Sequence, residues 1–287
     1  MDRETVGIIG LGLLGSAVAE RIAASGRAVV GYDVDPECCR HLADIGATPQ
    51  SSVREVFDSA AIVGLVLPNS DVARTVIEDA GAIRPRTTIL DMTTGDPDDM
   101  AKMGADLAAR NVSYIDATVG GSSEQARQRD AIVMAGGETA AVDRCRDLLA
   151  TFAREVFHVG PCGAGARMKL AMNLVLGLNR AALAEGLAFA RACGLSVDDA
   201  FEAFRAGPAY SRAMDIKGRR MIEHDFRPVA RLSQHRKDVD LILAAAARTG
   251  ARTPLSRLHR DLLVQVEKAG FGGEDNSAII RAFETGS

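Results

Sequence analysis

The stretch Gly10-Leu11-Gly12-Leu13-Leu14-Gly15 lies between a short apolar run at residues 6–10 and a helical pattern at residues 16–24. The apolar run is typical of a buried strand, so the three glycines fall in a turn from a strand to a helix. In such a turn Gly10 permits a tight bend, Gly12 lets backbone amides approach a phosphate, and Gly15 lets the helix pack closely on the strand. A lone glycine triplet is a weak signal. This context is specific, and it predicts that residues 10–15 bind the pyrophosphate of a dinucleotide.

A second strand pattern at residues 28–32 ends in Asp33, at about the separation from the glycines that a ribose-binding acid has. A carboxylate there accepts hydrogen bonds from the ribose hydroxyls of NAD and repels the 2′-phosphate of NADP. Asp35 is a competing candidate, Arg40 could reach a phosphate, and both acids are also typical turn residues before Pro36. We expect Asp33 to bind the ribose and NAD to be preferred over NADP.

Strand and helix patterns alternate through the rest of the first half. Strands are expected at 61–67, 88–90, 114–115, 131–135 and 155–158, and helices at 53–56, 72–80, 100–109 and 140–152. Such alternation is typical of βαβ units and a parallel sheet, whose ligands bind beyond the carboxyl ends of the strands. We therefore predict a dinucleotide-binding Rossmann domain over residues 1–162.

The loops that follow three of these strands would line one edge of the sheet. They are Leu67-Pro68-Asn69, Asp91-Met92-Thr93-Thr94-Gly95 and the segment 116–123. The last contains Gly120-Gly121-Ser122-Ser123, which offers backbone N–H groups and hydroxyls to a carboxylate or a similar anion. Taken alone, a flexible turn is the simpler interpretation of that loop.

The alternation stops near residue 163, and apolar residues then recur at helical spacing over 170–192, 197–204, 232–247 and 254–268. The segment 163–173 opens the first of these helices. It places Lys169 and Asn173 four residues apart, on one helical face. We predict an all-α domain over residues 163–287, so the fold class is α/β with a Rossmann domain followed by a helical domain.

Composition argues against several classes of partner. The 287 residues are 47% hydrophobic and 25% charged, with a net charge of −4, so no basic field attracts nucleic acid or an anionic membrane. No apolar run is long enough to span a bilayer, and the first residues lack a signal-peptide pattern. The five cysteines are scattered and the five histidines lack metal-binding spacing. We expect a cytoplasmic protein that binds no metal, nucleic acid or membrane.

Taken in order, these pieces resemble the β-hydroxyacid dehydrogenases, the family that includes 3-hydroxyisobutyrate dehydrogenase and tartronate semialdehyde reductase. The matching segments are 10–15, 67–68, 91–94, 116–121, 163–173, 237–238 and 273–278. The resemblance implies a Rossmann domain followed by a helical domain, with chains paired through the helices into a homodimer or a higher homo-oligomer.

The resemblance also implies roles for individual residues. Lys169 matches the catalytic lysine and Asn173 the asparagine that orients the substrate. Lys237 matches a lysine near the nicotinamide and the substrate, and Thr94 a contact beside the nicotinamide ribose. Leu67 and Pro68 fall in a matching segment beside the cofactor. A lysine in a desolvated cleft near a second cation has a lowered pKa, which suits a general acid and base. The alternatives are a solvated helix lysine at 169 and an ion-paired surface lysine at 237.

Three positions depart from the family pattern near the substrate. Thr118 replaces a proline, Gly120 replaces a serine that helps to hold the substrate carboxylate, and Met172 replaces the first of two asparagines. We still expect substrate contacts from Thr118, Gly120, Gly121 and Ser122, whose hydroxyl could replace the missing donor. Residues 167–237 hold 13 Lys/Arg against 7 Asp/Glu, which suits an anionic substrate. The sequence predicts conversion of a small hydroxy acid, or its sulfonate or phosphonate analogue, to a semialdehyde or keto form.

Two other functions compete with this one. Imine reductases share the two-domain plan but typically lack the lysine, so Lys169 favours a carbonyl or alcohol substrate. A non-catalytic reader protein that binds NAD can lose the lysine and keep the glycines, whereas this chain has both.

Overall fold

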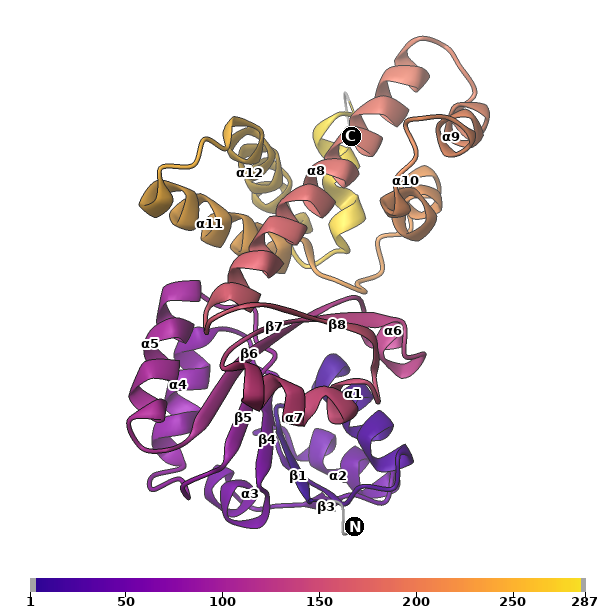
Figure 1. Cartoon of the computed structure of the whole chain (residues 1–287). Helices are drawn as coiled ribbons and strands as arrows, with labels where there is room; N and C mark the ends of the chain where they lie inside the picture. The colour runs from indigo at the N-terminus through magenta and orange to yellow at the C-terminus, as the bar shows by residue number, and fades with distance from the viewer. Residues whose placement is uncertain (1–3, 285–287) are drawn as a thin grey trace. The chain divides into compact units, whose positions relative to one another are not determined.

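The computed structural model of the chain, shown in Figure 1, describes residues 4–284. It forms two compact units, Met1–Lys169 and Leu170–Ser287. The division falls inside one long helix, α8 (Ala164–Ala192). The sequence predicted a domain boundary between residues 162 and 163, just before α8 begins. In the structure, the boundary between the two units follows the sixth residue of α8, Lys169.

The first unit is built on an eight-stranded sheet with the order β3-β2-β1-β4-β5-β6-β7-β8. The strands are β1 (Val6–Ile9), β2 (Val29–Tyr32), β3 (Thr48–Pro49), β4 (Ile62–Leu65), β5 (Thr88–Asp91), β6 (Ser113–Gly120), β7 (Ala131–Gly136) and β8 (Ala153–Gly160). All pairings are parallel except that of β6 with β7, which is antiparallel.

The antiparallel pair is an exception to the parallel sheet that the sequence predicted. The chain between β6 and β7 spans only residues 121–130 and holds one short helix, α6 (Ser123–Arg127). A parallel pair needs a crossover of a dozen or more residues, so this connection returns the chain as a neighbouring antiparallel strand. Strand β6 is also much longer than the predicted 114–115, because its polar residues Asp116 and Thr118 are fully buried.

Helices cover both faces of the sheet (Figure 1). Side chains from α1, α2 and α7 pack into one hydrophobic core and those from α3, α4 and α5 into the other. Their bounds are α1 (Leu13–Ala24), α2 (Pro36–Asp44), α3 (Val53–Ser59), α4 (Ser70–Asp79), α5 (Pro97–Ala108) and α7 (Thr139–Leu149). Within β1, Ile8 belongs to the first core and Ile9 to the second, as the alternation of a strand requires.

Side chains mark the starts of four of these helices. Asp35, Ser52, Asn69 and Asp96 each accept a backbone N–H in the first turn of α2, α3, α4 and α5 respectively. Helix α1 differs, because it begins after Gly12 with no side-chain cap and no acidic residue in its first turn. Its first N–H groups therefore have no side chain to bind.

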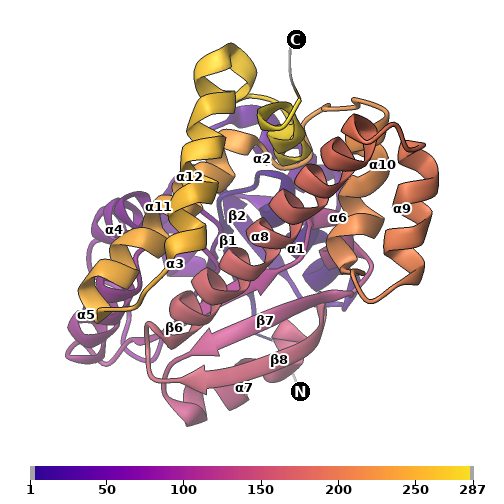
Figure 2. The ribbon, with the colours of Figure 1, turned by 90° about the horizontal axis from the view of Figure 1, so that it is seen from above.

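The second unit is helical and has its own apolar core, which includes Leu187, Phe201 and Leu263. Figure 2 shows its helices α11 and α12 side by side. Besides the later part of α8, its elements are α9 (Val197–Ala206), η1 (Met214–Gly218), α10 (Arg219–Ile222), α11 (Leu232–Thr249), α12 (Pro254–Val266), η2 (Glu267–Phe271) and η3 (Asn276–Ala282). The predicted fold class, a Rossmann domain followed by an all-α domain, is confirmed. Within residues 4–284, no helix has the length and apolar character that crossing a membrane requires.

Candidate active site

The glycine-rich loop joins β1 to α1, and its three glycines are constrained in different ways. Gly10 has φ +89°, and a Cβ there would lie 2.2 Å from the carbonyl oxygen of Val66. A Cβ on Gly15 would lie 1.9 Å from the carbonyl oxygen of Gly10. Gly12 has an ordinary φ of −63°, and its Cβ would meet no atom within 4 Å. The fold therefore requires Gly10 and Gly15, while the space in front of Gly12 is open for a ligand.

The start of α1 fits an anionic group at this place. The helix has no side-chain cap, so the N–H groups of Leu13, Leu14 and Gly15 point out of its first turn without a side-chain acceptor. The helix dipole adds partial positive charge at the same end. Together with the open space at Gly12, these donors fit the pyrophosphate of a dinucleotide.

Asp33 directly follows β2, and its side chain is hydrogen-bonded to the glycine loop. Its Oδ2 accepts the N–H of Leu11 at 2.6 Å, and its Oδ1 accepts the N–H of Asp35 at 2.8 Å. Each carboxylate oxygen can accept a further hydrogen bond, so this arrangement leaves acceptors for ribose hydroxyls. The rival acid, Asp35, caps α2 by accepting the N–H of Glu37. Arg40, the candidate phosphate ligand, pairs with Glu37 on the surface.

The loops after β4 and β5 are held together beside this region. The N–H of Leu67 donates to the hydroxyl of Thr93 at 3.3 Å, and the N–H of Thr93 donates to Asp91 at 2.9 Å. Thr93 is buried, Pro68 is exposed and Thr94 is half-buried. Of the two threonines, Thr94 is thus the more accessible; its contact with the nicotinamide ribose stays a prediction.

Asp116 on β6 holds the start of α8. Its carboxylate accepts the N–H of Gly163 at 2.9 Å and that of Ala166 at 2.7 Å. Burial, only partly offset by these hydrogen bonds, raises the pKa of Asp116 to about 6. A Cβ on Gly165 would lie 2.3 Å from the carbonyl oxygen of Asp116, so this glycine lets the helix start approach the strand closely. The sequence did not predict that Asp116 binds the start of α8, although Asp116 stood in a segment that matched the family.

Lys169 is held by the same strand. Its Nζ donates to the carbonyl oxygen of Val119 at 2.6 Å, and its side chain is half-buried. The hydroxyl of Thr118 lies 3.0 Å from the carbonyl oxygen of Gly165 and 3.3 Å from that of Met134. Thr118 is fully buried, so its hydroxyl serves the junction of β6 and α8. Asp116, Thr118 and Val119 of β6 thus anchor the first two turns of the helix that carries Lys169.

Beyond Gly120, the predicted substrate loop leads into α6. Gly121 has φ +141°, which glycine alone adopts readily. The Ser122 hydroxyl accepts the N–H of Gln125 at 3.2 Å, and the Ser122 N–H donates to Oε1 of Gln125 at 3.0 Å. This reciprocal pair is a capping box. The Ser122 hydroxyl proton is then the group that this residue has left to offer a substrate.

In the second unit, α8 and α11 bring Asn173 and Lys237 to the same carboxylate. Nδ2 of Asn173 donates to Oδ2 of Asp238 at 3.1 Å, and both residues are buried. Nζ of Lys237 lies 3.9 Å from Oδ1 of Asp238. Burial lowers the pKa of Lys237, and the neighbouring Asp238 opposes that shift. Lys237 is half-buried rather than on the surface, and Asp238 lies in the segment 237–238 that matched the family.

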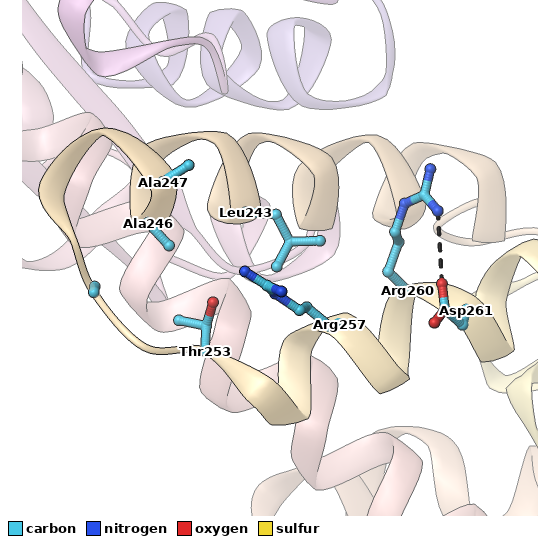
Figure 3. A pocket seen from close by; sticks show the side chains of 8 residues that line it. Leu243, Ala246, Ala247, Thr253, Arg257, Arg260 and Asp261 are labelled. Carbon is cyan, nitrogen blue, oxygen red and sulfur yellow. Dashed lines mark ion pairs between the residues drawn. The ribbon is translucent and has the colours of Figure 1, made fainter.

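A separate hollow of about 400 Å³ lies between the end of α11 and the start of α12 (Figure 3). None of the predicted site residues lines it. Two of its charged members pair with each other, since Arg260 lies 3.6 Å from Asp261, and Arg260 also lies 2.9 Å from Asp240. We do not assign it to the site.

By fold and site, the chain belongs to the class of oxidoreductases that bind a nicotinamide dinucleotide. Residues 5–160 match the family model for the NAD-binding domain of 6-phosphogluconate dehydrogenase. Residues 163–283 match the model for the NAD-binding region of NADP-dependent 3-hydroxyisobutyrate dehydrogenase. The chain belongs to the β-hydroxyacid dehydrogenase family, as the sequence predicted, and it is an NAD(P)-dependent dehydrogenase or reductase acting on hydroxyl groups.

Two individual relatives have names that agree with this assignment, and a third is named as a nuclear factor. The chain is 28% identical to 2-(hydroxymethyl)glutarate dehydrogenase from Eubacterium barkeri over 97% of this chain and 94% of the relative. The crystal structure of 3-hydroxyisobutyrate dehydrogenase from Salmonella typhimurium has a TM-score of 0.89 at 28% identity, covering 97% of this chain and 99% of that one. The cytokine-like nuclear factor N-PAC of Drosophila melanogaster is 25% identical over 97% of this chain, which spans 47% of that protein's length.

Proposed function

We propose that this enzyme interconverts a small anionic hydroxy acid, or its sulfonate or phosphonate analogue, and the corresponding semialdehyde or keto form. The observation that carries the proposal is the placement of Lys169. Its ammonium group is held on β6 in the same unit as the glycine loop. When bound, the nicotinamide supplies or accepts the hydride. The chain must then supply the proton.

Lys169 is suited to donate and recover that proton. Its ammonium group donates an N–H to the carbonyl oxygen of Val119, which fixes the position of Nζ beside β6. After it gives up a proton, the neutral amine still has an N–H for Val119, so its position survives the transfer. In reduction Lys169 protonates the oxygen of the nascent alcohol, and in oxidation it removes the hydroxyl proton.

Asn173 and Lys237 are proposed to bind and orient the substrate, with Lys237 facing its anionic group. Burial lowers the pKa of Lys237, as it also lowers those of Arg180 and Lys217 in the second unit. Much of the predicted excess of positive charge forms ion pairs, such as that of Lys217 with Asp275. The excess by itself therefore marks no anion site. The name of the Eubacterium barkeri relative, a hydroxymethylglutarate dehydrogenase, is in keeping with an acidic hydroxy substrate.

We propose NAD as the preferred cofactor. Residues 10–15 would hold the pyrophosphate and Asp33 the ribose. Leu67, Pro68, Thr94 and Lys237 would lie nearer the nicotinamide. The preference rests on Asp33, whose carboxylate has acceptors for two hydroxyls and repels a phosphate.

We also propose that the protein is a homodimer or a higher homo-oligomer. Four large apolar side chains of the second unit are each at least 60% exposed, namely Phe189, Leu195, Leu255 and Leu258. Apolar area of this kind favours burial against a second copy. A cytoplasmic location stays a prediction, and the five cysteines are free thiols in the structure.

The function is tested with a panel of small hydroxy acids and their sulfonate and phosphonate analogues, assayed by NADH production. A Lys169→Met variant should lower kcat by about 10²–10⁴-fold and leave NADH binding unchanged. Arg167→Met is the matched control, because Arg167 is an exposed residue of the same helix that pairs with Asp98. A Lys169→Met enzyme with near-normal kcat would refute the assigned role.

One competing function is that of an NAD-binding protein without catalysis, and the relative N-PAC is named as a nuclear factor. This function predicts tight NADH binding and no turnover of any panel member, including cyclic imines. Turnover of an imine alone would instead indicate an imine reductase.

A further inference from the structure

Asn173 and Asp238 form a buried pair in the second unit, one on α8 and one on α11. Their side chains are joined by the hydrogen bond from Nδ2 to Oδ2 at 3.1 Å. We propose that Asp238 is a positioning residue, which fixes the orientation of the Asn173 amide toward the substrate. This inference rests on the proposed function, in which Asn173 contacts the substrate.

The chemistry of the pair determines which end of the amide faces the carboxylate. An ionised carboxylate only accepts hydrogen bonds, whereas an amide has a donating NH₂ group and an accepting oxygen. Asp238 therefore holds the NH₂ end of Asn173. The carbonyl oxygen, together with the second N–H, is left for the substrate. In that orientation the carbonyl oxygen of Asn173 can accept a hydrogen bond from the hydroxyl group of an alcohol substrate.

Two cations lie near the Asp238 carboxylate. Arg180 lies on α8 seven residues after Asn173, hence on the same helical face. It is 5% exposed, and Asp238 is one of the two carboxylates that attract its guanidinium group. Lys237 provides a second cation, 3.9 Å from the other carboxylate oxygen. Without cations, burial would favour the neutral acid, which can also donate and would no longer select one amide orientation.

Close packing of α8 on α11 and α12 fixes the geometry of the pair. Gly177 lies one helical turn after Asn173, and a Cβ there would lie 2.7 Å from Nε2 of His235 and 2.7 Å from Cε1 of His259. These two rings pack against each other with centroids 5.2 Å apart. The glycine thus lets both neighbouring helices approach α8 next to the amide.

The test is a double-mutant cycle on the full-length enzyme, with the best substrate of the panel. Asp238→Asn should lower kcat/KM for the hydroxy acid by about tenfold or more, with a higher substrate KM and an unchanged Kd for NADH. In an Asn173→Ala background the same change should have less than about a twofold effect, because its target is gone. Asp240→Asn is the control, since Asp240 lies on the same helix and pairs with Arg236 and Arg260.

Equal losses in the two backgrounds would overturn the proposal, because they would indicate a purely structural role for Asp238. A silent Asp238→Asn alongside an impaired Asn173→Ala would overturn it and leave the proposed function standing. If Asn173→Ala itself retains full activity, Asn173 has no role in substrate binding. That result would contradict this part of the proposed function and, with it, the positioning role of Asp238. If Asp238→Asn does not fold, Asp238→Glu replaces it in the cycle. That variant keeps the charge beside Arg180 but displaces the acceptor, and the same dependence on Asn173 is expected.

Discussion

Among single residues, Gly12 shows most directly that the first unit is built for a ligand. A methyl group on Gly12 would meet no protein atom within 4 Å, whereas one on Gly15 would lie 1.9 Å from a backbone oxygen. A bound pyrophosphate would occupy the space that Gly12 leaves open, so binding rather than folding requires a glycine there.

We expect Gly12→Ala to unfold at the wild-type temperature but to bind NADH at least about tenfold more weakly, because the methyl group keeps the phosphates from the N–H groups of α1. Gly15→Ala should instead lose about 1–3 kcal/mol of stability through overpacking. Thermal unfolding and fluorescence titration with NADH measure the two effects. Wild-type NADH affinity in Gly12→Ala would show that the cofactor does not approach the loop there.

At the level of elements, β6 does the most to position the proposed chemistry. Its Asp116 accepts hydrogen bonds from two N–H groups at the start of α8. Three residues after Asp116, the carbonyl oxygen of Val119 accepts a hydrogen bond from the Lys169 ammonium group. The buried Asp116 carboxylate is the unusual member of this junction, because its pKa is raised to about 6 rather than lowered.

This raised pKa predicts how stability depends on pH. The ordinary value for this carboxyl is 3.8, so between pH 3.8 and about 6 the folded chain binds more protons at Asp116 than the unfolded chain does. Its contribution to stability therefore falls as pH rises through that window, by about 3 kcal/mol in total. Urea unfolding of the wild type and Asp116→Asn at pH 4 to 7 should show the wild type losing stability relative to the variant. Parallel curves would contradict the raised pKa.

For the whole molecule, cofactor binding is coupled to folding. NADH at about 100 times its Kd adds about 2.7 kcal/mol to the unfolding free energy, which raises Tm by several degrees. NADPH at the same concentration should give a smaller rise, because Asp33 repels the 2′-phosphate. Differential scanning calorimetry with each cofactor measures the difference. A larger rise with NADPH would rule out the proposed NAD preference.

The sequence by itself determined the class of fold and the family. Strand, glycine loop, helix and acid follow one another within residues 6–33, so their pattern is visible without knowledge of long-range contacts. The same holds for Lys169 and Asn173, which are four residues apart in one helix. Helical periodicity likewise predicted the longer helices of the second unit to within a few residues at most of their ends.

Only the tertiary structure decided which side chains hold those residues. Asp116 binds Ala166 from 50 residues away, and Asp238 binds Asn173 from 65 residues away. Neither contact leaves a periodic signal, because periodicity reports which face of an element is buried and not what that face meets. The antiparallel direction of β7 was likewise not predicted. The capping box of Ser122 and Gln125, in contrast, is a local motif that the sequence does carry. Local pattern therefore determined the elements and the cofactor loop, while hydrogen bonds between distant segments decided the positions of the proposed catalytic groups.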